Sequence, residues 1–240
     1  MNATQGPFLI GPRWLTGSLL IVGVFLIFGP AITQPESYHA FADARRLFGV
    51  PNFWNVISNL PFAVLGVMGL WRFHGIVNRA LFAGLLLTAF GSAYYHLAPN
   101  DARLVWDRLP MTLVFMALLA GLIAQSRDRR WEPWILAILI GCGMASVLWW
   151  NATGDLRPYA VVQFGPGLVM LPVFWRSTGR RYLGGALGCY VLAKFAEFSD
   201  AAIYSVMSLS GHTLKHGLAA FAAYCLWKFA GTMRSPLAGS

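Results

Sequence analysis

Long apolar stretches alternate with short polar or proline-containing segments along the whole chain. A transmembrane helix needs about 17–25 mostly apolar residues, because the hydrocarbon core of a bilayer is about 30 Å thick. Eight stretches reach this length, at residues 14–33, 53–71, 79–97, 109–125, 133–151, 159–175, 182–206 and 212–231. The pattern therefore predicts an all-α integral membrane protein with eight spanning helices.

The composition supports a membrane protein and argues against a soluble one. Hydrophobic residues make up 57% of the chain and charged residues only 11%, against about 45–50% and about 25% in soluble domains. The net charge of +9 does not indicate a nucleic-acid partner, because Lys and Arg in membrane proteins report orientation and contact with anionic headgroups. We therefore expect the lipid bilayer to be the main partner.

The distribution of basic residues predicts the orientation of the chain. Most of the Lys and Arg residues in the predicted loops fall on the side that carries Arg13, Arg72 and Arg127, and few fall on the opposite side. The positive-inside rule then places both termini in the cytoplasm. The first stretch is longer than the apolar region of a signal peptide, so we expect an uncleaved helix.

Three histidines are the strongest candidates for chemistry. His212 and His216 are one helical turn apart, so they lie on one face of a helix. His96 ends another apolar stretch, and the predicted topology places all three at one level, near the outer face. Three imidazoles are the protein ligands of one kind of catalytic zinc site, in which the fourth position stays open for water. A buried histidine that only packs and hydrogen-bonds is the alternative for each.

Two further polar residues are predicted at the same level. Ser92 lies four residues before His96 and shares its helix face, and Asp107 follows in the next outer loop. Asp107 is a candidate to hold or deprotonate a water, and Ser92 to stabilise an oxyanion. The alternatives are a Ser92 hydroxyl bonded to the preceding helical turn and an Asp107 that caps a helix beginning near Leu109.

The remaining polar residues of the apolar stretches are less informative. Lys194, Glu197 and Asp200 follow one another at helical spacing, which fits ion pairs between helices or the lining of a substrate cavity. Lys215 points away from His216 on the helix and is expected to reach the headgroup zone. His39, in the first outer loop, has no partner at ligand spacing, and His74 is predicted on the cytoplasmic side, away from the other histidines.

Taken together, these motifs resemble a known family. The sequence Ser92-x-x-x-His96, then Asp107, then His212-x-x-x-His216 is similar to the pattern of alkaline ceramidases and their superfamily of transmembrane hydrolases, which includes the adiponectin-receptor-like proteins. The segment Asn52-Phe-Trp-Asn-Val-Ile-Ser-Asn59 looks like the opening of the first core helix in alkaline ceramidases.

The resemblance runs from about Asn52 to Phe229 and implies a seven-transmembrane-helix hydrolase core plus one additional N-terminal helix. The domains it implies are an N-terminal helix and outer loop at 1–51, a seven-helix ceramidase-like domain at 52–231, and a cytoplasmic tail at 232–240. The compact loops indicate a bacterial-type member. Its place would be the inner membrane, with the active site toward the periplasm.

The resemblance also implies an activity. It implies hydrolysis of the amide bond of ceramide, or of another N-acyl membrane lipid, by zinc-activated water. His96, His212 and His216 would hold Zn²⁺, with Ser92 and Asp107 as the catalytic residues. Eukaryotic members carry an acidic calcium site just before the first core helix. Here that segment offers one carboxylate before Asn52, so it is a poor match to a calcium site.

Other functions remain open at this point. A receptor-like member of the superfamily would bind lipid without efficient turnover, although the sequence shows no sizeable cytoplasmic domain that would read a signal. A haem-binding electron carrier would use axial histidines on opposite sides of each haem, whereas the paired histidines share one face. A transporter is motivated only by the charged residues near position 197. No obligate protein partner is indicated.

Overall fold

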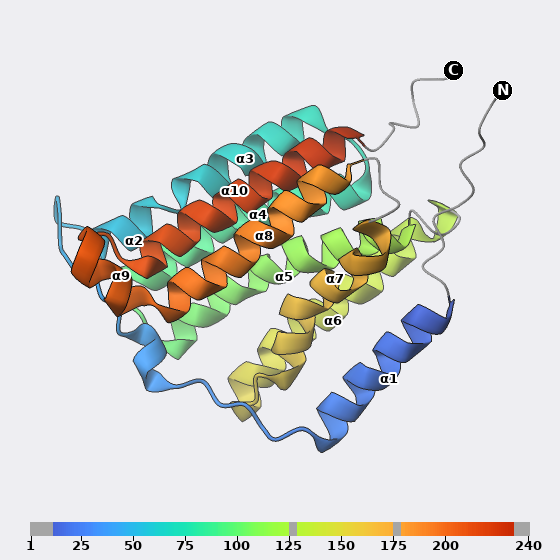
Figure 1. The fold of residues 1–240 in the computed structure, drawn as a ribbon, viewed down its shortest axis with the longest axis horizontal. Helices are drawn as coiled ribbons and strands as arrows, with labels where there is room; N and C mark the ends of the chain where they lie inside the picture. Colours follow the sequence, from blue (N-terminus) through green and yellow to red (C-terminus); the bar gives the residue numbers. More distant parts are fainter. Residues whose placement is uncertain (1–11, 125–128, 175–178, 233–240) are drawn as a thin grey trace.

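The computed structural model describes residues 12–124, 129–174 and 179–232, and it is built of helices (Figure 1). The α-helices in this part of the chain are α1 (Pro12–Phe28), α2 (Phe53–Ile57), α3 (Leu60–Arg72), α4 (Ile76–Leu97), α5 (Asp101–Ala124), α6 (Glu132–Thr153), α7 (Arg157–Phe174), α8 (Arg180–Phe198), α9 (Asp200–Met207) and α10 (Gly211–Thr232). Two short 3₁₀ helices occur at Glu36–His39 and Arg129–Trp131. The prediction of an all-α fold is confirmed.

Within the part of the chain that the structure describes, four helical segments are long and apolar enough to cross a membrane by length and composition. They are Phe53–Arg72, Ile76–Leu97, Asp101–Ala124 and Glu132–Thr153, and Thr16–Phe28 is a shorter apolar helix. The count of eight spans, and its division into seven core helices and one added helix, stays a prediction. Of the sequence features used above, Arg127 and residues 233–240 of the predicted tail lie outside the described residues.

Two predicted helix boundaries were wrong. Helix α5 begins at Asp101 rather than near Leu109, and Pro110 lies inside it. The side chain of Asn100 accepts a hydrogen bond from the backbone N–H of Arg103 at 2.9 Å, which is the bond of a helix N-cap. The predicted stretch 182–206 is also interrupted, because α8 ends at Phe198 and α9 begins at Asp200.

Two glycines allow the helices around the buried polar residues to approach closely. A Cβ atom at Gly91 of α4 would lie 2.1 Å from the carbonyl oxygen of Trp106 in α5. A Cβ atom at Gly211 of α10 would lie 2.2 Å from the carbonyl oxygen of Ala196 in α8. Both distances are far below van der Waals contact, so these crossings require glycine. They place the residues beside them, including Ser92, at helix–helix contacts.

Helix α1 lies at the edge of the bundle and packs on α7 (Figure 1). The guanidinium of Arg157 donates hydrogen bonds to the carbonyl oxygens of Leu26 at 3.1 Å and Gly29 at 2.6 Å. These groups lie at the end of α1, where carbonyls lack helical partners. Arg157 also pairs with Asp155 at 2.8 Å, and its hydrogen bonds lower the pKa of that carboxyl to about 2.

Buried polar side chains gather near one end of the bundle, where α2, α9 and the beginning of α10 lie (Figure 1). They come from four helices and three connecting segments: Asp43, Asn55, Asn59, Ser92, His96, Asp107, Arg108, Ser210, His212, Thr213 and His216. Burial of so many polar groups is costly unless each is paired or serves a function.

Candidate metal centre

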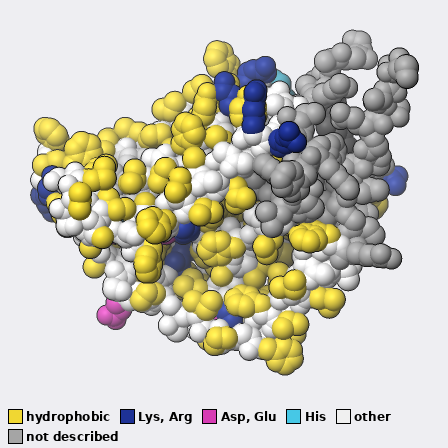
Figure 2. Space-filling model, viewed as in Figure 1, with side chains coloured by type: hydrophobic (Ala, Val, Ile, Leu, Met, Phe, Trp, Pro, Cys, Tyr) yellow, Lys and Arg dark blue, Asp and Glu magenta, His cyan; other side chains and the backbone are white. Residues whose placement is uncertain are grey.

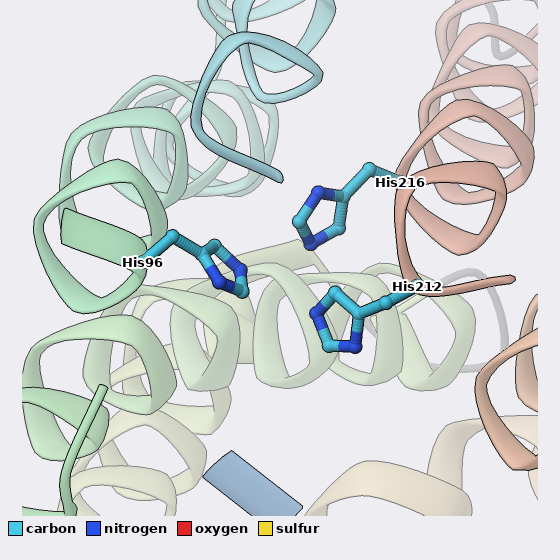
Figure 3. A group of neighbouring side chains, drawn as sticks. All are labelled: His96, His212 and His216. Atoms are coloured by element: carbon cyan, nitrogen blue, oxygen red, sulfur yellow. The ribbon is translucent and has the colours of Figure 1, made fainter. Parts of the chain in front are cut away.

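The three predicted histidines meet at one point. His96 lies in the last turn of α4, and His212 and His216 lie in the first turns of α10. Their rings point toward one another (Figure 3), with centroids 4.9 Å to 5.0 Å apart. One candidate ligand nitrogen from each lies within 4.8 Å of the others, and all three residues are buried. The structure thus brings together residues that are more than one hundred positions apart in the sequence.

Local interactions fix the start of α10, and with it the two paired histidines. The Ser210 hydroxyl accepts a hydrogen bond from the backbone N–H of Thr213 at 3.0 Å, as a helix N-cap does. The Asn55 side-chain oxygen accepts a hydrogen bond from the Thr213 hydroxyl at 2.7 Å. The Asp200 carboxylate accepts one from the backbone N–H of His212 at 2.8 Å. The first turn of α10 is therefore held from α2 and α9.

The donor atoms fit a metal ion better than a packed core. Both ring nitrogens of His96 and Nε2 of His212 are buried and have no hydrogen-bond partner among the described residues. Unpaired buried polar atoms are uncommon in folded proteins because each one costs its hydration. Neutral imidazoles that converge on one point are the donor set of a three-histidine zinc site. The residues present therefore fit the zinc ion that the sequence predicts.

Ser58 determines which nitrogen of His216 is available, and the sequence interpretation missed it. The Ser58 hydroxyl lies 2.7 Å from Nδ1 of His216 and 3.2 Å from the carbonyl oxygen of Asn55. A hydroxyl has one hydrogen, and the Asn55 carbonyl can only accept, so Ser58 donates to Asn55 and accepts from Nδ1–H of His216. This tautomer leaves the lone pair of Nε2 free for a metal. Hydrogen bonds of this kind commonly orient metal-binding histidines.

Ser92 and Asp107 lie close together, but Asp107 lies within helix α5 and not in the outer loop predicted from the sequence. Both are buried, and the Ser92 hydroxyl lies within hydrogen-bonding reach of the Asp107 carboxyl. Gly91 and Trp106, the residues before them, form the close α4–α5 crossing described above. The alternative role of Asp107 as a helix cap is wrong, because Asp107 lies inside α5 rather than before it.

A loop residue covers the histidines. The ring of Phe41 lies 4.8 Å from that of His96 and 4.4 Å from that of His212, measured between centroids. The next residue, Ala42, donates its backbone N–H to Asp200 at 2.9 Å. Asp200 thus joins this loop to the backbone of His212, which explains why a carboxylate lies at this position. Asp200 therefore accepts hydrogen bonds from backbone N–H groups and does not take part in the ion pairs that its helical spacing from Glu197 had suggested.

A buried ion-pair cluster lies beside the histidines. Glu197 accepts hydrogen bonds from Lys194 at 2.8 Å, from Lys215 at 2.5 Å and from the Tyr38 hydroxyl at 3.1 Å. Lys215 therefore turns into the protein, and the expectation that it reaches the headgroup zone was wrong. Burial raises the pKa of Tyr38 well above its usual value, and the nearby Glu197 charge adds to this effect. Lys215 also lies within electrostatic reach of Asp107.

The segment before α2 has its own pairing. Both carboxylate oxygens of Asp43 accept hydrogen bonds from Arg45, at 2.8 Å and 2.6 Å. These bonds lower the pKa of Asp43. His39, the histidine of this segment, lies 2.8 Å from the Tyr95 hydroxyl and 3.1 Å from Asp101. Asn52 donates to the carbonyl oxygen of His96 at 2.9 Å and so supports the turn that carries a candidate ligand.

Comparison with known proteins places this site in a family. The model of the Ceramidase family matches residues 49–179, which include Ser92, His96 and Asp107, and the paired histidines of α10 follow beyond the matched segment. A comparison with curated proteins finds no match. The apolar helices and this family indicate a membrane-embedded protein that acts on lipid. Because the matched segment covers more than half of the chain, the protein belongs to the Ceramidase family.

Proposed function

We propose that this protein is a zinc-dependent intramembrane hydrolase that cleaves the amide bond of ceramide or of a related N-acyl lipid. The observation that carries the proposal is the convergence of His96, His212 and His216 beside the Ser92–Asp107 pair in a chain of the Ceramidase family. The three-way convergence favours zinc over haem, because haem ligands lie on opposite sides of the iron.

Each polar group near the histidines has a role in this proposal. Bound zinc would supply Lewis acidity for the amide carbonyl and would make a water acidic enough to ionise near neutral pH. An oxygen of Asp107 accepts a proton from the attacking water and delivers it to the amide nitrogen as the C–N bond breaks. The Ser92 hydroxyl donates a hydrogen bond to the carbonyl oxygen as negative charge develops there. The products are a fatty acid and a lipid amine.

The surroundings support this chemistry. Phe41 covers two of the candidate ligands and reduces access of bulk water. Ser58 holds His216 with Nε2 free, as zinc binding requires. The proposed placement of the protein follows the sequence: eight spans in a bacterial inner membrane, both termini in the cytoplasm, and the histidines toward the periplasm. The proposed domain limits are likewise 1–51, 52–231 and 232–240.

The first experiment combines metal content with turnover. Purified protein is expected to hold about one zinc ion, as three histidines and one open position bind a single ion, and to release fatty acid from ceramide until a chelator removes the metal. His216→Ala is expected to lose zinc and turnover together. His74→Ala, which changes an exposed histidine between α3 and α4, is the matched control and should keep both. Full zinc and full turnover in His216→Ala would disprove the three-histidine centre.

A receptor-like role is the second candidate, and the same experiment separates it from the enzyme. Zinc that is bound without release of fatty acid from any N-acyl lipid would support binding without turnover. The enzyme is favoured because Asp107, the proposed proton carrier, lies buried and within hydrogen-bonding reach of Ser92, which is one helical turn from His96.

A further inference from the structure

Arg108, the residue after the candidate base, is buried and forms no ion pair with any described residue. Its side chain is nine-tenths or more buried, and its guanidinium lies 4.1 Å from the ring centre of Trp150 and 4.9 Å from that of Tyr159. One nitrogen, Nη2, donates to the side-chain oxygen of Gln34. A second nitrogen, Nη1, is buried and has no hydrogen-bond partner in the described part of the chain. Aromatic faces stabilise a guanidinium, but they do not use its N–H donors.

The carboxylates near Arg108 have other partners. Within the described ranges, no carboxylate lies within ion-pairing distance of its guanidinium. Glu197 accepts from two lysines and a tyrosine, and Asp200 accepts from two backbone N–H groups. Asp107 lies within hydrogen-bonding reach of Ser92 and within electrostatic reach of Lys215 and Arg108, but it forms no direct ion pair with Arg108 among the described residues. A buried cation without a counter-ion is strongly unfavourable, so the free edge of Arg108 calls for an anion from outside the chain.

The location of this free edge connects it to the proposed chemistry. Arg108 follows Asp107 on α5. Its guanidinium lies 5.8 Å from the ring centre of Tyr38, and the Tyr38 hydroxyl donates a hydrogen bond to Glu197. Lys194 and Lys215, the partners of Glu197, lie within electrostatic reach of His212. The space-filling view shows Lys and Arg side-chain atoms recessed between apolar side chains, where α8 and α5 lie in Figure 1 (Figure 2). Arg108, Lys194 and Lys215 therefore place positive charge close to the candidate site.

We propose that Arg108 recognises an oxyanion on the lipid substrate, so that the preferred substrate is an N-acyl lipid with a phosphate, sulfonate or carboxylate close to the amide. A guanidinium donates two parallel hydrogen bonds to such a group, which a lysine does not do. The inference rests on the proposed function, because it names the substrate class of the same site. A neutral ceramide leaves Nη1 of Arg108 unpaired, whereas an anionic amide lipid supplies its partner.

The test compares two amides that differ only in charge. The full-length protein in detergent is given ceramide and its phosphate monoester with the same chains, and kcat/KM is measured from fatty-acid release. N-acylglycine extends the comparison to a carboxylate. We expect the anionic amide to be preferred about tenfold or more, and Arg108→Gln to remove about tenfold of that preference, as a lost charge-assisted bidentate contact does. Arg108→Lys keeps the charge without the planar fork and should give an intermediate ratio.

A matched control exists on the same helix. Arg103 also lies over an aromatic ring, at 4.4 Å from that of Tyr94, but it is only half-buried. Arg103→Gln should keep the wild-type ratio. A second measurement does not depend on turnover: the anionic amide should raise the melting temperature of the wild type, and Arg108→Gln should abolish this rise.

The outcomes separate the inference from the proposed function. If kcat/KM for the anionic amide is about equal to that for ceramide, and Arg108→Gln does not change this ratio, the anionic substrate is overturned and the hydrolase stands. Absence of all hydrolysis would instead overturn the proposed function, while an Arg108-dependent rise in melting temperature would still support the anion site. An equal rise with phosphatidic acid, which has no amide, would show a general anionic-lipid site and overturn the substrate assignment.

Discussion

Removal of the Ser58 hydroxyl tests how His216 is prepared for metal. In Ser58→Ala the imidazole loses the acceptor that lies 2.7 Å from Nδ1, while Nε2 and the other two histidines are unchanged. The hydrogen on Nδ1 is then no longer fixed, so the ring rotates more freely and both tautomers become populated. We expect weaker zinc binding with little change in overall folding, because a single hydrogen bond of this kind contributes about 0.5–1.5 kcal/mol to stability.

The size of the effect follows from the surroundings of Ser58. Loss of a hydrogen bond behind a metal-binding histidine typically reduces affinity about 10-fold to 100-fold, which corresponds to about 1.4–2.8 kcal/mol. Ser58 is only half-buried, so water can partly replace the hydroxyl, and we expect the lower end, about tenfold. A competition titration of purified protein against a chelator of known zinc affinity measures this difference directly.

Two variants make the test specific. Ser58→Thr keeps a hydroxyl at the same position and should retain most of the zinc affinity. Ser146→Ala removes a buried serine of α6 whose hydroxyl bonds the carbonyl oxygen of Gly143 at 2.6 Å, so it controls for the loss of a helical hydroxyl that contacts none of the three histidines. If Ser58→Ala binds zinc within about twofold of the wild type, the tautomer argument is refuted.

Three further predictions concern the helix crossing, the oxyanion donor and the outer loop. Gly91→Ala should lower both melting temperature and kcat, because its Cβ would lie 2.1 Å from the Trp106 carbonyl oxygen and overpacking costs about 1–3 kcal/mol; unchanged values would contradict the close crossing. Ser92→Ala should keep zinc and lose about 10²-fold to 10³-fold in kcat, and equal kcat would exclude Ser92 as the donor. The hydrogen bond from Arg45 is the main cause of the lowered pKa of Asp43, whose usual value is 3.8. The ionised Asp43 therefore stabilises the folded protein above pH 3.8, and this contribution is lost as the pH falls through the lowered pKa. The melting-temperature gap between wild type and Asp43→Asn should therefore close in acid, and a constant gap would rule out this linkage.

The helical fold was predictable because it depends on short-range pattern. Apolar stretches of spanning length are visible in the sequence, and backbone groups in lipid are satisfied within a helix. The errors occurred where a side chain overrides the apolar pattern. Asn100 starts α5 two turns before the predicted Leu109, because its side chain caps the backbone N–H of Arg103. Pro110, which follows the predicted start, lies inside a helix that has already begun.

The residues of the candidate site were predictable where they share a helix face or lie at the same predicted depth in the membrane. His212 and His216 needed only the i, i+4 rule, and His96 only its place at the end of an apolar stretch. The contacts of Ser58 and Phe41 with these histidines cross between distant segments and leave no spacing signal in the sequence. The same holds for Lys215, since only the packing of α10 on α8 places Glu197 within 2.5 Å of it. Sequence pattern therefore identifies the groups that bind or react, whereas the groups that orient them and neutralise their charges depend on how the helices cross.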